Sequence, residues 1–341
     1  MAYTTINKST DNFTPFTFSG TGQSSVTGVG FTPDMFIHKN RGNTQSWGVI
    51  DVVRGNGNYL GTNSTNAQLS DVGNYGIATD GYTFSNNDQF YNSGSMVYWN
   101  WKAGGTGSSN SDGSITSTVS ANQTAGFSIV SWTGSNANAT IGHGLGVVPK
   151  MIIFKNRATA TSWMVYNATQ GATKFLRLNT TDAVGTGSTP FNDTAPTSSV
   201  FSVGANGDTN GSSQAMIAYC FAEKTGYSKF GSYTGNGNAD GTFVYTGFKP
   251  AFVMVKQSSG TGFWTIIDNK RPEFNPASKW LYPNNSDAEY NASSYPVDFL
   301  SNGFKNKSTG SYFNSSGSTY IYMAFASAPL VGSNNVPCTA R

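Results

Sequence analysis

The amino-acid sequence predicts an all-β protein that consists of three tandem antiparallel β-sandwich modules, each of about 100 residues. Of its 341 residues, 37% are hydrophobic, 14% are aromatic and only 11% are charged. Such a chain is too aromatic to be disordered and too poor in Ala, Leu, Glu, Lys and Arg to be helical. Apolar residues nowhere recur at helical spacing over three turns, whereas Gly and Asn punctuate the chain about every eight to twelve residues, as in a sandwich. A pattern that occurs three times sets the number of modules.

The repeated pattern keeps the same register in each module. A proline precedes a short apolar run that ends in a lysine, and a tryptophan follows the lysine by eight residues. The three sets are Pro33, Lys39 and Trp47; Pro149, Lys155 and Trp163; and Pro250, Lys256 and Trp264. A leucine followed three residues later by an asparagine also recurs, at Leu60 and Asn63, Leu176 and Asn179, and Leu281 and Asn284. Chance would not hold this register, so we expect one fold for all three modules.

The first module covers residues 1–103 and includes an N-terminal segment. Its apolar run predicts a strand that starts after Pro33, where the missing N–H does no harm, and residues 96–101 predict its closing strand. Residues 104–124 are rich in Gly, Ser and Asn and predict a flexible linker. We therefore expect the first module to move more freely than the other two.

The second module covers residues 125–224 and the third covers 225–328. No comparable spacer separates these two modules, so we expect them to pack against each other. In the third, the runs at 252–256 and 264–268 are β-branched and aromatic and flank a polar stretch, which predicts a hairpin. Closing strands are expected at 216–221 and 320–325. Residues 329–341 are expected to form a C-terminal tail.

Charge and cysteine content argue against several classes of protein. Twenty Lys and Arg against 17 Asp and Glu leave a formal charge of +3, too small and too dispersed for a nucleic-acid-binding surface. The start of the chain lacks the layout of a secretory signal, and no stretch of about 18 apolar residues occurs, so we expect synthesis in a cytoplasm without membrane insertion. Two cysteines, Cys220 and Cys338, are too few for a disulfide framework and are expected to be free thiols.

The two histidines favour structural roles. His38 takes the position of Phe154 and Val255 in the other modules, which indicates a partly buried strand residue. His143 lies in a glycine-rich loop, where a capping or turn role is expected. Neither accompanies a nucleophile motif such as Gly-x-Ser-x-Gly, so a Ser-His-Asp hydrolase is not expected. We predict no catalytic residue, no cofactor and no enzyme activity.

Acidic residues form no recognisable catalytic or metal-binding pattern. Two Asp and Arg pairs recur, with amides in the second module: Asp51 and Arg54, Asp268 and Arg271, and Asn167 and Gln170. We interpret the charged pairs as surface turn pairs that contribute little to stability. Residues 236–241 resemble the start of a calcium loop, but Gly247 stands where a glutamate should close it, so no metal is predicted. The repeated tryptophans could stack on sugars, but their recurrence at one strand position favours core packing.

Several motifs resemble a repeat module of virion proteins from marine tailed bacteriophages. They are Gly142-His-Gly-Leu-Gly146 with Pro149, Phe154-Lys-Asn-Arg157, and the segments at 192–202, 217–223 and 226–235. The two ends, 5–10 and 337–341, are similar to those of stand-alone members, so the resemblance covers nearly the whole chain. It implies a tail-fibre-like or other particle structural protein with sandwich modules of the jelly-roll or lectin-like type, and it assigns no catalytic residue.

The resemblance therefore implies a non-enzymatic structural component of a bacteriophage particle, a tail-fibre-like or head-appendage protein located in the virion. Its expected partners are other capsid or tail proteins, host envelope glycans, and further copies of itself, for example in a trimer. The alternatives are a capsid decoration protein without a ligand, a polysaccharide-degrading enzyme, and a glycan-binding protein that uses exposed aromatics such as Tyr59 or Tyr91. Three modules could also imitate a trimer around a pseudo-threefold axis, although the long linker argues against a tight ring.

Overall fold

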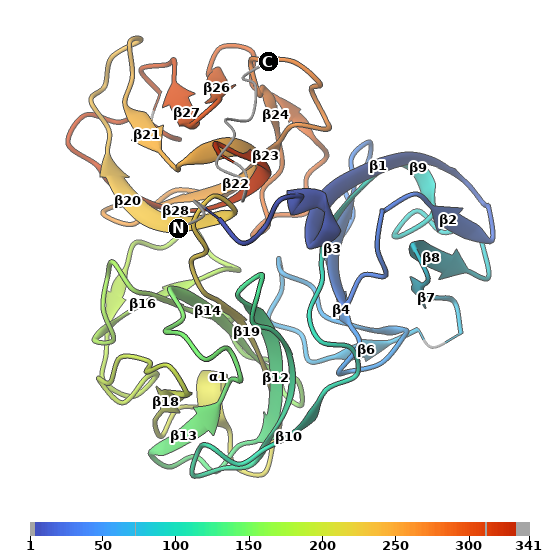
Figure 1. Ribbon diagram of the computed structural model, residues 1–341, viewed down its shortest axis with the longest axis vertical. Coiled ribbons are helices and arrows are strands. Elements are labelled where there is room, and N and C mark those ends of the chain that lie inside the picture. The colour runs from blue at the N-terminus through green and yellow to red at the C-terminus, as the bar shows by residue number, and fades with distance from the viewer. Residues whose placement is uncertain (1–3, 72, 311, 332–341) are drawn as a thin grey trace.

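The computed structural model describes residues 4–71, 73–310 and 312–331. These residues form three lobes around a common centre: lobe 1 (4–103), lobe 2 (104–224) and lobe 3 (225–331) (Figure 1). The ladders between the strands are antiparallel, which confirms the all-β prediction. Helical structure in the described part of the chain is limited to η1 (Ser9–Asp11) and α1 (Gly207–Asn210). No described helix has the length and apolar character needed to cross a membrane.

Each lobe contains the same four-stranded arrangement, in which the lobe's first and last long strands lie side by side. In lobe 1 the order is β1 (Phe13–Thr21), β9 (Ser93–Trp101), β3 (Met35–Asn40) and β4 (Gly48–Asp51). In lobe 2 it is β12 (Phe127–Thr133), β19 (Ala215–Phe221), β14 (Met151–Asn156) and β15 (Met164–Asn167). In lobe 3 it is β20 (Ser228–Thr234), β28 (Thr319–Pro329), β22 (Phe248–Gln257) and β23 (Trp264–Asp268).

Smaller sheets complete each lobe. Lobe 1 adds β2 (Ser25–Thr27), β8 (Gly81–Phe84) and β7 (Tyr75–Ala78), and the ribbon β5 (Asn58–Tyr59) with β6 (Leu69–Ser70). Lobe 2 adds β13 (Ala139–Gly142) with β18 (Val200–Val203), and extends its main sheet by β16 (Lys174–Arg177) and β17 (Gly185–Thr186). Lobe 3 adds β21 (Phe243–Tyr245), β27 (Gly303–Asn306) and β26 (Val297–Leu300), and the ribbon β24 (Lys279–Trp280) with β25 (Tyr290–Asn291).

The segment expected to be a flexible linker is part of the sheet of lobe 2. β10 (Ser108–Asn110) and β11 (Ser117–Asn122) join the edge of that sheet beside β12. Val119 of β11 is only 7% exposed and lies in the core of lobe 2. The expectation of flexibility is wrong, because an antiparallel edge supplies hydrogen bonds to a backbone whose polar side chains contribute little burial of their own.

The closing strand of each lobe is buried on both faces. In β9, Met96 and Tyr98 belong to the core of lobe 1, whereas Val97, Trp99 and Trp101 belong to a core shared by all three lobes, hereafter the central core. β19 and β28 alternate in the same way. Successive side chains point to opposite faces of a strand, so a strand covered on both sides has an unbroken apolar sequence.

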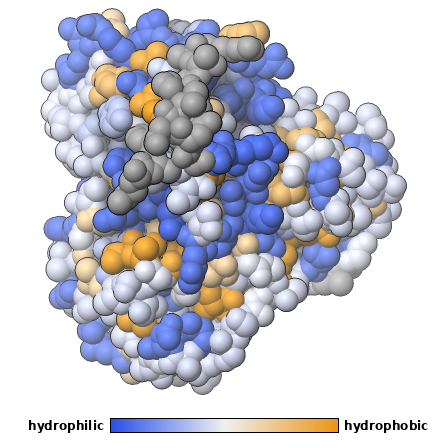
Figure 2. Space-filling model, viewed as in Figure 1, coloured by the Kyte–Doolittle hydropathy of each residue, from blue (hydrophilic) through white to orange (hydrophobic). Residues whose placement is uncertain are grey.

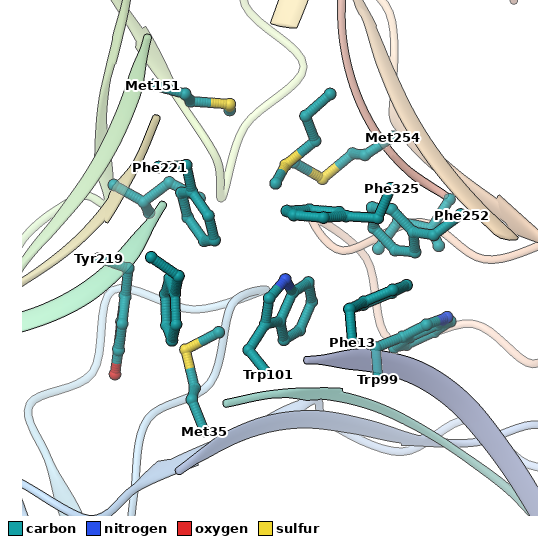
Figure 3. Packing of buried hydrophobic residues seen from close by; sticks show 14 of the residues in the cluster. Phe13, Met35, Trp99, Trp101, Met151, Tyr219, Phe221, Phe252, Met254 and Phe325 are labelled. Atoms are coloured by element: carbon teal, nitrogen blue, oxygen red, sulfur yellow. The ribbon is translucent and has the colours of Figure 1, made fainter. Parts of the chain in front are cut away.

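Three aromatic residues mark the middle of the central core (Figure 3). Trp101, Phe221 and Phe325 end the apolar runs of their closing strands. Their ring centroids lie 6.2 Å (Trp101 to Phe221), 5.7 Å (Trp101 to Phe325) and 6.1 Å (Phe221 to Phe325) apart. Phe13 of β1 stacks on Phe325 at 4.7 Å, which joins the start of lobe 1 to lobe 3. The three lobes therefore surround a quasi-threefold axis.

This arrangement corrects two expectations about the modules. Lobe 1 is not attached loosely, because its residues Trp99 and Trp101 are fully or almost fully buried in the central core. The linker argument against a tight ring is wrong as well, since β10 and β11 pack on lobe 2. On the face drawn in Figure 2, mainly hydrophilic residues cover the junction of the lobes and apolar residues form small separate patches. Of the expected C-terminal tail, only 329–331 are among the described residues, and Pro329 ends β28.

Candidate functional site

The repeated tryptophans lie at the contacts between lobes. Trp47, Trp163 and Trp264 are at most 1% exposed, which confirms the predicted core packing. Each indole N–H donates to a backbone carbonyl of another lobe: Trp47 to Asn285 at 2.8 Å, Trp163 to Gly61 at 2.8 Å, and Trp264 to Arg177 at 2.9 Å. These bonds run from lobe 1 to 3, from 2 to 1 and from 3 to 2, so they close a cycle. The tryptophans therefore hold the ring of lobes together.

The repeated asparagines fix the position of the tryptophans. Each side-chain Oδ1 accepts a hydrogen bond from the tryptophan backbone N–H of its own lobe: Asn63 from Trp47 at 3.1 Å, Asn179 from Trp163 at 2.8 Å, and Asn284 from Trp264 at 2.9 Å. This bond satisfies the N–H at the start of a buried strand. The leucine-asparagine part of the repeat thus supports the same inter-lobe contact.

The repeated lysines are buried at these contacts too. Lys155 Nζ donates to the Thr65 carbonyl of lobe 1 at 3.2 Å, and Lys256 Nζ donates to the Thr181 carbonyl of lobe 2 at 3.3 Å. Lys39 Nζ donates to carbonyls within lobe 1. Burial lowers the pKa of each of the three lysines to about 8, and one carboxylate near each opposes the shift. Lys155 and Lys256 therefore carry charge into the inter-lobe contacts at a desolvation cost.

The two Asp and Arg pairs are buried. The Arg54 Nε to Asp51 Oδ2 distance is 2.5 Å and the Arg271 Nε to Asp268 Oδ2 distance is 2.7 Å, with all four side chains 0% exposed. Each carboxylate also accepts a hydrogen bond from a neighbouring lobe: Asp51 from the Tyr219 hydroxyl at 2.7 Å, and Asp268 from Trp99 Nε1 at 2.9 Å. The interpretation as surface turn pairs is wrong, because adjacent lobes cover both turns.

The contact between lobes 2 and 3 lacks the buried Asp and Arg pair. Asn167 and Gln170 stand at the equivalent positions of lobe 2, and Met323 of β28 stands where Trp99 and Tyr219 stand in their own closing strands. A thioether has no hydrogen to donate, and a neutral amide does not require the charge-assisted bond that a buried carboxylate does. At this contact the side chain that would donate the hydrogen bond and the carboxylate that would accept it are therefore both absent.

The histidines have structural environments. His38 is 0% exposed, packs between Phe90 at 4.7 Å and Tyr98 at 5.0 Å, and faces Gly48, which has no side chain to displace it. Burial lowers its pKa to about 3, with the charge of Lys39 as a smaller cause. The expectation of a buried strand residue is confirmed, and burial is complete. His143 Nδ1 accepts from the Leu145 N–H at 3.2 Å, which confirms the predicted turn role.

In the calcium-like loop and at Cys220, the side chains that could bind a metal are engaged by other groups or buried. In the loop at 236–241, Asp240 pairs with Lys305 Nζ at 2.5 Å, so an ammonium group stands beside the carboxylate. Asn236 and Asn238 accept hydrogen bonds from backbone N–H groups within the loop. Cys220 is a buried free thiol whose pKa is raised by burial, and Cys338 lies outside the described residues. Across 4–71, 73–310 and 312–331, no three His, Cys, Asp or Glu residues gather as metal ligands would.

The best candidate for a ligand site is a pocket of about 300 Å³ in lobe 1, hereafter the lobe-1 pocket. Its walls include Tyr59, Leu69, Asp71, Asp88 and Phe90. Tyr59 and Leu69 pair across the β5–β6 ribbon and therefore share one face, and Asp71 follows β6 directly. The Tyr59 and Phe90 rings lie 5.0 Å apart, centroid to centroid. The pocket thus combines an aromatic wall with two carboxylates.

Both aromatics nominated for glycan contact line this pocket, but only one is accessible. Tyr59 is partly exposed. Tyr91 is 1% exposed, stacks on Tyr75 at 4.4 Å and donates its hydroxyl hydrogen to Asn86. The expectation that Tyr91 is exposed is wrong, because the aromatic core of lobe 1 extends to the pocket wall. Tyr59 remains the accessible ring.

The lobe-1 pocket is electronegative. Asp71 accepts a hydrogen bond from Asn74 Nδ2, and Asp88 accepts one from the Phe90 N–H at 2.7 Å. Burial, together with the smaller effects of the Asp71 and Asp88 charges, raises the pKa of Tyr91 to about 12, and the same three causes raise the pKa of Tyr59. None of the described residues that line the pocket is basic. The site therefore has the charge and the aromatic surface to attract a cation.

Sequence reasoning missed Asp71 and Asp88. They lie on separate segments of lobe 1, so no spacing along one strand pairs them. One signal was available in the repeat: extending its register places Gly187 and Ala292 at the position of Asp71 in the other lobes. A charge present in a single copy of a repeat is a candidate for a role specific to that copy.

Comparison with known proteins identifies one family, whose match covers nearly all of the described residues. None of the curated proteins matches the chain. Residues 8–329 match a family described as "Domain of unknown function (DUF7483)", and this range includes the main sheets of all three lobes. The chain therefore belongs to the DUF7483 family, whose single domain corresponds here to the complete three-lobed ring.

Proposed function

We propose that this protein is a non-enzymatic structural component of a bacteriophage particle, tail-fibre-like or a head appendage. The observation that supports it is that all three repeated tryptophans, and two of the three repeated lysines, donate hydrogen bonds to another lobe, while the repeated asparagines position the tryptophans. Three copies of a pattern that builds a closed body, with no catalytic group among them, fit a part that must hold its shape in an assembly. The resemblance of the sequence motifs to virion modules supplies the setting.

We further interpret each lobe as a β-sandwich module. In lobe 1, residues of β3 and β9 share one core with residues of β7 and β8, as two facing sheets would. Lobe 3 has the same division between β22 or β28 and β26 or β27. The jelly-roll or lectin-like type remains part of the proposal.

Locating the protein in purified particles tests the structural role. Mass spectrometry of washed particles should detect it at a fixed ratio to the major capsid protein, and imaging should show a three-lobed density of matching size on the head or tail. Its absence from washed particles, with abundant protein in the lysate, would contradict the proposal.

The enzymatic alternative makes a separate prediction, because Asp71 and Asp88 place two carboxylates in one pocket. The purified chain should release no reducing ends from capsule or envelope polysaccharides of the host. Release that is lost in an Asp71→Asn/Asp88→Asn variant would establish a hydrolase and overturn the non-enzymatic role.

Glycan contact through lobe 3 is a second candidate function. Phe243 and Tyr245 on β21 are 43% and 54% exposed, while Val244 between them is buried. A Cβ atom built on Gly303 would lie 2.9 Å from the Phe243 ring, so this ring lies against the sheet surface and presents its outer face. The Asp240–Lys305 ion pair stands beside Phe243, which pairs with Lys305 across the ladder. Flat rings beside polar groups suit the C–H and O–H groups of a pyranose.

A glycan array of the full chain tests this second function. We expect saturable binding of host-surface sugars that falls about five- to thirtyfold in a Phe243→Ala/Tyr245→Ala variant, since each exposed ring contributes about 0.5–1 kcal/mol. Phe274→Ala is the matched control, because Phe274 is 83% exposed but lies outside this sheet. Equal losses in both variants would count against a site on β21.

A further inference from the structure

The lobe-1 pocket is open because one position differs among the three lobes. Each small ribbon carries an aromatic residue: Tyr59 on β5, Phe175 on β16 and Trp280 on β24. Two residues after it stand Gly61, Arg177 and Tyr282, respectively. The Trp163 and Trp264 indoles donate to the carbonyls of Gly61 and Arg177, which confirms that these two positions are structurally equivalent.

In lobe 2 this position is filled by a guanidinium group. The Arg177 Cζ atom lies 5.0 Å from the centroid of the Phe175 ring, and its Nη1 lies 3.7 Å from an oxygen of Asp182. The cation thus covers the ring and faces a carboxylate. Cation–π contact and charge attraction both favour this placement.

In lobe 3 the position is filled by an aromatic ring. Tyr282 is 9% exposed and packs against Phe263 at 4.8 Å and Tyr312 at 6.3 Å. Tyr312 packs in turn on Trp280, the ribbon aromatic of this lobe, at 5.4 Å. Both other lobes therefore cover the ribbon aromatic with side chains of their own.

Lobe 1 has the ring and the negative charge but no side chain at the position of Arg177 and Tyr282. Gly61 extends no atoms over Tyr59, and Asp71 stands where lobes 2 and 3 have Gly187 and Ala292. Asp88 adds a second carboxylate to the same pocket. Compared with lobe 2, the cation has been removed and the negative charge has been increased.

The rim of the pocket is held in place by other lobes. The Gly61 carbonyl accepts from Trp163 of lobe 2, and Gln68 bonds to Arg157 of lobe 2 through both backbone and side chain. Gln45, which also lines the pocket, donates its backbone N–H to the Ser286 carbonyl of lobe 3 at 3.0 Å. A site anchored by two other lobes loses little conformational entropy when it binds.

We propose that the lobe-1 pocket binds a guanidinium group, the end of an arginine side chain presented by a partner protein. The group stacks on Tyr59 and Phe90 and pairs with Asp71 and Asp88, in the manner of Arg177 on Phe175 within the chain itself. Guanidinium suits this site better than ammonium because its planar face stacks on a ring while its edge donates to carboxylates. The inference goes beyond the proposed structural role and does not depend on it.

Titration of the full chain with small probes tests the chemistry. Butylguanidinium should shift the amide resonances of Tyr59, Leu69 and Asp71 in a saturable manner, and butylammonium should bind more weakly. Butylurea, which has nearly the same shape without the charge, should not bind. Added salt should weaken the binding, because the carboxylates are near the surface. Equal binding of butylurea would overturn the proposal.

Two variants with different chemistry locate the site. Asp71→Asn/Asp88→Asn should weaken butylguanidinium binding on the order of tenfold, the combined effect of two partly exposed charge contacts. Gly61→Arg should abolish binding, because it supplies the cation that lobe 2 already has. The atoms nearest to a Cβ built on Gly61 are Ser64 Oγ at 3.2 Å, the Trp47 carbonyl oxygen at 3.5 Å and Asn63 Oδ1 at 3.6 Å, so the chain can accept a side chain there with a small shift of Ser64.

Asp182→Asn is the matched control, because it removes a carboxylate near the equivalent site of lobe 2. It should leave butylguanidinium binding unchanged. Near-ultraviolet circular dichroism of every variant confirms the fold, and binding that survives in folded Gly61→Arg would contradict the assignment. A peptide with one central arginine should bind like butylguanidinium, and its glutamine counterpart should not. Binding of glucosamine without binding of the arginine peptide would show an amino-sugar site and overturn the proposed partner.

Discussion

Asp51 shows how one buried carboxylate joins two lobes. It accepts hydrogen bonds from the side chain of Arg54 in its own turn and from the Tyr219 hydroxyl of lobe 2. Arg54 reaches the same hydroxyl at 3.2 Å. The side chains of Asp51 and Arg54 are 0% exposed. Their polar atoms therefore depend on hydrogen bonds within the protein, because water cannot replace a lost partner.

Asp51→Asn is expected to lower the free energy of unfolding by about 3–5 kcal/mol, because it leaves the buried Arg54 charge without its partner. Urea denaturation followed by tryptophan fluorescence measures the loss. Asp182→Asn, at a carboxylate that is 58% exposed, should change the stability by less than about 0.5 kcal/mol.

A triple variant separates charge pairing from shape. Asp51→Asn, Arg54→Gln and Tyr219→Met together reproduce the set found at the contact between lobes 2 and 3, Asn167, Gln170 and Met323. This variant should recover much of the stability lost in Asp51→Asn, since no charge stays buried alone. A triple variant that is less stable than the single one would show that the charges are favourable in themselves.

The buried lysines predict a stability that rises with pH. Their pKa is about 8 in the folded chain and about 10.5 when unfolded, so between these values the unfolded chain binds more protons. The free energy of unfolding should therefore increase as the pH rises from 8 to 10, by about 1–2 kcal/mol per lysine. Above about pH 10, buried tyrosines with raised pKa values, such as Tyr82, reverse the trend.

Lys155→Met should reduce this rise by about one third, as measured by urea denaturation at pH 7.5, 8.5 and 9.5. The negative charge of Asp208 opposes the lowering of the Lys155 pKa, but burial outweighs it. Lys150→Met removes an exposed lysine of the same lobe and should leave the slope unchanged. A slope that is independent of Lys155 would place the pH dependence elsewhere.

At the scale of elements, the repeated register was enough to predict the equivalent strands but not their packing. The closing strands at 96–101, 216–221 and 320–325 occur as expected within β9, β19 and β28. Their apolar runs indicate two buried faces without showing what covers the second face. Another sheet of the same module and the strands of a neighbouring lobe give the same sequence pattern, so the central core could not be predicted from one module.

The candidate site was predicted only in part, for a related reason. Tyr59 was singled out as an aromatic that could contact a ligand, and it lines the lobe-1 pocket. The pocket itself depends on Gly61, a residue without a side chain, and on carboxylates from two separate segments. An absent side chain is visible in a sequence only when the repeats are compared position by position.

Strands β10 and β11 should protect the connection between lobes 1 and 2 from proteolysis. The Lys102 N–H donates to the Asn12 carbonyl at 2.9 Å, and the Lys102 carbonyl accepts from the Asn122 side chain at 3.2 Å. Limited trypsin digestion of the native chain should therefore not cut after Lys102. A flexible linker would instead release lobe 1 early.

Val119→Asp provides the comparison, because it places a charge on the buried face of β11. It should detach the strand and expose the bond after Lys102 to trypsin, while the central core keeps the three lobes folded together. Rapid cleavage of the native chain at Lys102 would contradict the role given to β10 and β11.

For the whole molecule, the central core predicts unfolding in one step. No lobe can separate without exposing Trp101, Phe221 or Phe325 to water. Calorimetry should give a single transition with a ratio of calorimetric to van't Hoff enthalpy near 1, whereas three independent modules would give a ratio of about 3. Trp101→Ala should lower the unfolding free energy by about 3–5 kcal/mol and affect all lobes together.

Residues 1–103 expressed alone give the complementary measurement. They should not adopt the folded structure, because the inward face of their four-stranded sheet would be exposed. A folded, monomeric fragment with native near-ultraviolet circular dichroism would show that the lobes are separate domains.

Covalent fusion of the three copies has a consequence for how such a molecule can change. In an assembly of three identical chains, any substitution appears at every equivalent place at once, so a residue that helps recognition in one place must be tolerated in the others. Here Gly61, Arg177 and Tyr282 occupy equivalent places and differ, while the tryptophans that join the copies are the same in all three. One polypeptide can thus keep a symmetric frame and let a single third of it acquire a new specificity.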